Sequence, residues 1–198
     1  RLAWRGHELR ETFTAQTMFP TIGAWRVCAV PAAEALPDGR LGPLPGDVAA
    51  GLAWVDVRQE PAHGEFQNLT ERFNVPLSSY AYERRDTDLV GYAAASLRSP
   101  DEREVRIAYQ APRPARVFLN GEELAQEVFA ESDALRVNRE WSRTAPARLR
   151  RGRNTLLIVS EHRGADEPWR WFLHTMAVGP DGLPAPDVVV EAAGSVLE

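Results

Sequence analysis

The chain has 198 residues, of which 44% are hydrophobic and 26% are charged, and its formal net charge is -5. This acidic balance argues against a nucleic-acid partner, because binding to a phosphate backbone draws most of its affinity from a basic surface. The chain contains no Lys, which excludes sites that depend on a Schiff-base or phosphate-binding Lys.

The first part of the chain shows one clear strand pattern. Residues 1–20 have no regular period, and we expect a linker from a preceding domain or an edge segment there, with residues 21–192 forming a single domain. The run from Trp25 to Val30 alternates, with Trp25, Val27 and Ala29 on one side, and this pattern predicts a strand. A loop rich in Pro and Gly follows, and Leu52 to Arg58 is the next predicted strand.

Alternating strands dominate the second half of the chain. From Glu104 to Ala111, Val105, Ile107 and Tyr109 face one way and the residues between them face the other. Further strands are predicted at 89–99, 116–124, 153–162, 170–178 and near 188–191. Short strands separated by turn residues are typical of sandwiches and barrels. We therefore predict an all-β fold, an antiparallel β-sandwich.

Two turns in this half have strong sequence support. Asn120-Gly121 lies between apolar runs, and these residues reach positive φ most easily, so a tight hairpin is predicted; a ligand-binding role for Asn120 is the alternative. Gly152 predicts a second turn that the side chain of Asn154 can cap. The Arg residues around Gly152 predict a solvated turn, with contact to an anionic glycan as the alternative.

The order of these motifs resembles a known family. YAAASLRS, PDER, EVRIAYQ, RVFLNGEEL, LRRGRNTLLIV and WRWFLHTMAV follow one another between about Tyr92 and Val178. This order resembles that of the galactose-binding-domain-like jelly rolls, which are appended to many bacterial carbohydrate-active enzymes. The resemblance implies a jelly-roll topology and a non-catalytic accessory module, because these motifs specify packing and turns rather than a ligand.

The resemblance also implies the partners and the location. It points to a carbohydrate, or a neighbouring domain of the same chain, as partner, and favours an extracellular or periplasmic location over the cytoplasm. Some sugar-binding relatives contain a structural calcium, but its ligands cannot be mapped onto this chain, so we expect neither a metal nor another cofactor. The chain begins at Arg1 without Met, so we expect it to be part of a longer protein.

The best candidate ligand-binding residue is Trp141. A sugar ring packs its C–H face on an aromatic ring, and nearby polar side chains bind its hydroxyl groups. Trp141 lies in a polar stretch that we expect to be a loop, with Arg139, Glu140 and Arg143 as polar partners. The alternative is a Trp that closes one end of the sandwich.

Trp169 is the second aromatic candidate. It is two residues from Trp171, so both fall on one face of a predicted strand, and one face of that strand must be core.

Other activities have weaker support. The single cysteine, Cys28, excludes an intrachain disulfide, and the four His show no metal-binding spacing. No apolar run approaches the 18 residues of a membrane-spanning helix, so no membrane partner is expected. Two alternatives to carbohydrate binding stay open: a structural domain that packs on a neighbouring catalytic domain, and a small glycoside hydrolase that uses loop acids.

Overall fold

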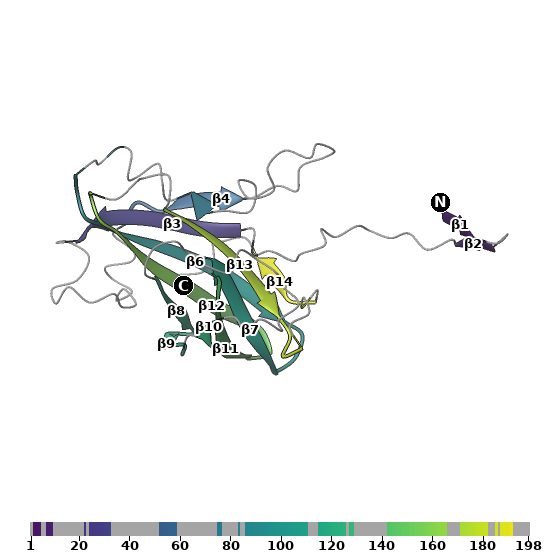
Figure 1. The fold of residues 1–198 in the computed structure, drawn as a ribbon. Helices are drawn as coiled ribbons and strands as arrows, with labels where there is room; N and C mark the ends of the chain where they lie inside the picture. Colours follow the sequence, from purple (N-terminus) through teal and green to yellow (C-terminus); the bar gives the residue numbers. More distant parts are fainter. Residues whose placement is uncertain are drawn as a thin grey trace.

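The structure is a computed structural model, and it shows two antiparallel sheets packed face to face (Figure 1). It describes residues 2–4, 7–9, 22, 24–32, 52–58, 75–76, 83, 86–110, 115–125, 127–128, 142–165, 171–181, 185 and 187–191. The prediction of an all-β antiparallel sandwich is confirmed. The jelly-roll topology stays a prediction.

The smaller sheet has five strands. Their order is β10 (Glu127–Val128), β11 (Ser142–Leu149), β7 (Arg103–Gln110), β13 (Phe172–Val178) and β5 (Val75–Pro76). No alternating pattern predicts β11, because Pro146 and four polar side chains interrupt its apolar residues. Pro146 lies past the two residues that pair with β10, where β11 becomes an edge and Pro is tolerated.

The larger sheet has seven strands. Six follow the order β4 (Val55–Arg58), β3 (Ala24–Pro31), β6 (Leu89–Ser99), β12 (Gly152–His162), β8 (Ala115–Leu119) and β9 (Glu122–Glu123). The seventh, β14 (Val189–Glu191), pairs with β6 beyond the end of β3, so these two strands divide one side of β6 between them. β1 (Leu2–Trp4) and β2 (His7–Leu9) form a separate two-stranded sheet.

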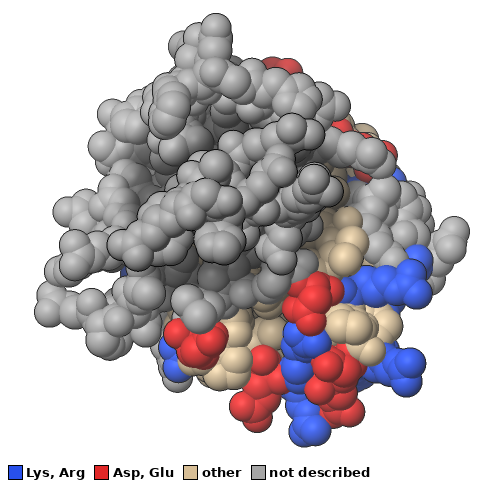
Figure 2. All heavy atoms as spheres, turned by 90° about the vertical axis from the view of Figure 1, so that its right-hand side faces the viewer, with Lys and Arg blue, Asp and Glu red and all other residues tan. Residues whose placement is uncertain are grey.

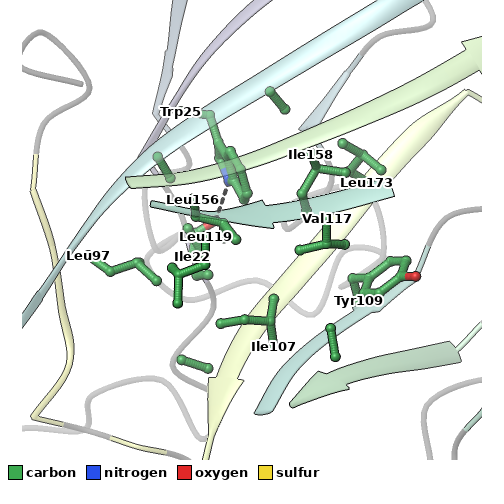
Figure 3. Packing of buried hydrophobic residues seen from close by; sticks show 14 of the residues in the cluster. Ile22, Trp25, Leu97, Ile107, Tyr109, Val117, Leu119, Leu156, Ile158 and Leu173 are labelled. Atoms are coloured by element: carbon green, nitrogen blue, oxygen red, sulfur yellow. Dashed lines mark hydrogen bonds between the residues drawn. The ribbon is translucent and has the colours of Figure 1, made fainter. Parts of the chain in front are cut away.

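The main core lies between the two sheets (Figure 3). The predicted inward faces are confirmed, since Trp25 and Val27 of β3 and Val105, Ile107 and Tyr109 of β7 are all buried in one cluster. Leu156 and Ile158 of β12, in the larger sheet, belong to the same cluster, and both are fully buried. The indole N–H of Trp25 donates to the carbonyl of Ile22, which satisfies the polar atom of a buried ring.

The outer face of the larger sheet is also buried. Cys28, Tyr92, Phe118 and Val159 form a second cluster there with Val90, and Leu52 and Trp54 pack against it. The guanidinium of Arg26 lies 5.9 Å from the centre of the Trp54 ring and 3.4 Å from a carboxylate oxygen of Asp56. Because both faces of β6 are covered, this strand consists of small and apolar residues rather than a polar alternation.

The two ends of the sandwich differ. At one end, which we call the turn end, tight connections join β6 to β7, β8 to β9 and β11 to β12. At the other, which we call the loop end, lie Pro31, Leu89, Gln110, Ser142, His162 and Phe172, each the terminal residue of its strand. None of the described residues belongs to a helix long and apolar enough to cross a bilayer.

Candidate binding surface at the loop end

Arg143 is the predicted site residue that the structure describes. It lies in β11 rather than in a loop, so the loop prediction is wrong for this position. Arg143 pairs in register with Tyr109, and Ala145 pairs with Ile107 in the core, so Arg143 occupies an inward-facing position. It is half-buried, whereas Ala145 is fully buried, which places Arg143 where the core meets the loop end.

Tyr109 is the nearest chemical partner of this position. Its side chain is buried, and burial raises the pKa of its hydroxyl to about 12, while the positive charge of Arg143 acts in the opposite direction. The Tyr109 hydroxyl therefore stays protonated at neutral pH and can both donate and accept a hydrogen bond. The sequence missed this neighbour because the register of β7 with β11 was not known.

Trp171 belongs to the core at the loop end. It is fully buried, and its indole N–H donates to the hydroxyl oxygen of Ser160 at 3.2 Å. The ring of His162 stacks on it, with the ring centres 5.1 Å apart and the planes inclined by 21°. Trp171 precedes β13 by one residue, and Leu173 within the strand is also fully buried, so the expectation that one face of this stretch is core is confirmed.

A close contact between two loops also fixes the loop end. Gly164 lies against the backbone of Asp86 and Thr87, so near that a Cβ atom on Gly164 would overlap the carbonyl carbon of Asp86. The N–H of Gly164 donates to a carboxylate oxygen of Asp88 at 2.9 Å. Asp86 has a positive φ of 67°. Only a residue without a side chain allows this approach, so Gly164 holds the segment after β12 against the segment before β6.

The other predicted site residues, Trp141, Arg139, Glu140 and Trp169, lie outside the described residues. Their described neighbours in sequence are Ser142, which follows Trp141, and Trp171, which comes two residues after Trp169. Ser142 pairs with Gln110 at the loop end, and Trp171 is packed at the same end. The binding role of these residues stays a prediction.

The Asn-Gly tip has a structural role at the turn end. Asn120 and Gly121 have φ values of 52° and 84°, and Leu119 pairs with Glu122, so the predicted two-residue hairpin is confirmed. The Asn120 amide donates to the side-chain oxygen of Asn154 at 3.0 Å, and its own oxygen accepts from the N–H of Thr155 at 3.0 Å. The tip is therefore joined to the neighbouring strand.

Asn154 caps the second predicted turn, as expected. It is fully buried, and its side-chain oxygen accepts from the N–H of Arg150 at 2.9 Å. Its amide donates to the carbonyl of Arg150 at 2.9 Å and to that of Gly152 at 3.2 Å. The two asparagines thus join two hairpins that are 34 residues apart in sequence.

Charged groups of both signs lie interspersed over the described lower part of the face in Figure 2. Within the described ranges, no group of three or more His, Cys, Asp or Glu side chains could hold a metal ion.

The solved structures compared with this chain resemble it distantly. No family model matches the chain, and no curated protein matches it. Among solved structures, a selenomethionine-labelled beta-glucosidase from Kluyveromyces marxianus aligns at 12% identity with a TM-score of 0.44, covering 78% of this chain and 16% of the enzyme chain. The beta-glucosidase from the same organism in complex with glucose aligns at 13% identity with a TM-score of 0.38, covering 56% of this chain and 14% of that one. At these values the likeness assigns neither a family nor a function to this chain.

Proposed function

We propose that this chain is a non-catalytic accessory module that binds carbohydrate at the loop end of its sandwich. The observation that supports the proposal is the half-buried Arg143, held on a strand beside the buried Tyr109, where the core opens toward the loop end. Arg offers several N–H donors in a fixed plane, and the neutral Tyr hydroxyl adds a donor and an acceptor. Neighbouring hydroxyl groups of a sugar need such donors and acceptors.

The base of this surface is rigid. Trp171 and His162 are stacked and buried at the same end of the sandwich, and the contact of Gly164 with Asp86 fixes two of the connecting segments. A polar site on a rigid base loses little conformational entropy when a ligand binds. Trp141 precedes β11 by one residue and is the aromatic ring that we propose to stack on the sugar.

Isothermal titration calorimetry against a panel of oligosaccharides tests this function. We expect millimolar or tighter binding of at least one glycan, and a loss of roughly tenfold in affinity for Arg143→Ala, because charged hydrogen bonds contribute about 1.5–3 kcal/mol. Trp141→Ala should weaken binding by a similar factor. Arg151→Ala, an exposed Arg of the turn end, is the matched control and should bind normally. If no glycan binds at millimolar concentration, the proposal is wrong.

The structural alternative, a domain that only packs on a neighbour, gains no support from the described surface. An interface of that kind needs a wide exposed apolar patch. The large hydrophobic side chains exposed among the described residues are Val55, at 51%, and Val189, at 55%, on the separate strands β4 and β14. Two isolated side chains are usual for a protein surface.

A further inference from the structure

The turn end contains two adjoining hollows that the proposed loop-end site does not use. The larger, of about 490 Å³, is lined by Glu104, Arg106, Pro146 and Pro180 among others. The smaller, of about 230 Å³, is lined by Glu102, Asn120, Glu122 and Arg150 among others. Leu124 and Arg148 line both hollows, so the two form one continuous surface, which we call the turn-end groove.

The groove combines apolar and charged groups in a way that suits a sugar. Leu124, Pro146 and Pro180 provide apolar surface without long flexible side chains. Charged side chains from β7, β11 and the turns stand beside this surface. A sugar ring has apolar C–H faces and a rim of hydroxyl groups, so it can contact both kinds of group at once.

The charge balance of the groove selects the class of ligand. Three carboxylates, of Glu102, Glu104 and Glu122, face three guanidinium groups, of Arg106, Arg148 and Arg150, so the formal charge of the lining is zero. An anionic ligand would be repelled by the carboxylates, and a cationic ligand would be repelled by the guanidinium groups. Neither therefore gains a net electrostatic attraction. A neutral polyol both donates and accepts, and it can use both kinds of group.

The groove is also held in place before any ligand arrives. Asn154 binds both the N–H and the carbonyl of Arg150, which fixes the backbone from which this side chain projects. Asn120 is held through its side-chain oxygen and nitrogen. Nε of Arg148 lies 2.7 Å from a carboxylate oxygen of Glu102, so these two side chains are paired at the rim of the groove. Such preorganisation lowers the entropic cost of binding a weak ligand.

We propose that the turn-end groove is a second carbohydrate site, selective for neutral oligosaccharides. The inference rests on the proposed function in that both concern glycans, but it assigns a different surface, at the opposite end of the sandwich. Arg150 is a donor of this site in the smaller hollow. Arg151, its exposed neighbour, lines neither hollow.

The test is a titration of the whole ¹⁵N-labelled chain followed by NMR. The neutral probes are cellopentaose, mannopentaose and xylopentaose; a galacturonic acid pentamer is the anionic probe and a glucosamine pentamer the cationic one. We expect at least one neutral probe to shift the amide signals of residues 120–122 and 148–152. Arg150→Ala should weaken that response roughly tenfold, while Arg151→Ala, which removes the same charge from the same turn, should leave it unchanged.

The outcomes separate the two carbohydrate sites. Shifts confined to residues 108–110 and 142–145 overturn the groove and leave the loop-end proposal standing. Shifts confined to the turn end support the groove and count against the loop-end site. No shift with any probe overturns both. Tighter binding of a charged probe than of every neutral probe overturns the proposed selectivity. An equal loss of affinity in Arg150→Ala and Arg151→Ala overturns the role of Arg150.

Discussion

At the scale of single residues, Asn154 illustrates how a buried polar side chain can stabilise two turns at once. Its side chain is fully buried, and both its oxygen and its nitrogen are engaged by backbone groups of its own turn and by Asn120. Its removal would leave partly buried backbone groups of Arg150 and the side-chain amide of Asn120 without this partner, and each such loss costs about 1–3 kcal/mol.

We therefore predict that Asn154→Ala lowers the free energy of unfolding by roughly 2–4 kcal/mol. Urea unfolding followed by circular dichroism would measure it. Arg151→Ala, in the same turn but exposed, is the control and should change stability by less than about 0.5 kcal/mol. Equal stabilities for these two variants would contradict the role given to Asn154.

Two glycines make distinct residue-scale predictions. Gly164→Ala introduces a Cβ atom against the backbone of Asp86, so we expect the free energy of unfolding to fall by about 1–3 kcal/mol, with altered amide signals around residues 86–88.

Gly121→Ala has open space around the new Cβ atom, but Gly121 has a φ of 84°, so the free energy of unfolding should fall by about 1–2 kcal/mol, with changes confined to the hairpin. NMR spectra of both variants would show whether the disturbance reaches the loop end only for Gly164→Ala.

At the scale of elements, β12 has two faces with different roles. Leu156 is fully buried between the sheets, whereas Leu157 packs partly buried on the outer cluster. Leu156→Ala should cost about 2–5 kcal/mol because it creates a cavity in a close-packed core. Leu157→Ala should cost less than half of that. Chemical denaturation of both variants compares them directly, and a larger loss at Leu157 would show that the faces had been exchanged.

Local sequence patterns predicted the strands with one solvent-exposed face and the turns that require residues with a positive φ. Val105, Ile107 and Tyr109 alternate clearly, and Asn120-Gly121 permits few conformations other than a hairpin. β11 escaped notice because the apolar residues that it buries are small: Ala145 and Ala147 contribute little to a hydrophobic pattern, and Pro146 lies between them. The site was harder still, since Arg143 and Tyr109 are 34 positions apart and meet only through the register of two strands.

At the scale of the whole molecule, buried acidic groups predict sensitivity to alkaline pH. Burial raises the pKa of the Cys28 thiol from 9.0 to about 12, and that of the Tyr92 hydroxyl from 10.0 to about 12. At a pH between the ordinary pKa of each group and its raised pKa in the folded chain, the unfolded chain releases a proton that the folded chain retains. A rise in pH therefore favours unfolding. This contribution to stability is complete below about pH 9 and is lost as the pH approaches about 12.

We predict that the free energy of unfolding falls between pH 9 and 11, by up to about 1.4 kcal/mol per pH unit for each such group. The double variant Cys28→Ala, Tyr92→Phe should show a shallower fall, because two of the buried groups that ionise are removed. Some fall should remain, because Tyr109 is still a buried hydroxyl. Urea unfolding at pH 7, 9 and 10.5 would measure both slopes. Identical slopes for the two proteins would mean that Cys28 and Tyr92 ionise equally in both states.

β6 relies on two short strands, each of which shields a different half of the same flank. β3 covers Leu89 to Ala94, and β14 covers Ser96 to Arg98. A protein cut ahead of Val189 would keep most of its sandwich but leave an unprotected ladder of amide and carbonyl groups in the middle of its larger sheet. Such an edge is a template for a strand from another copy, so shortened versions of this chain should self-associate before they unfold.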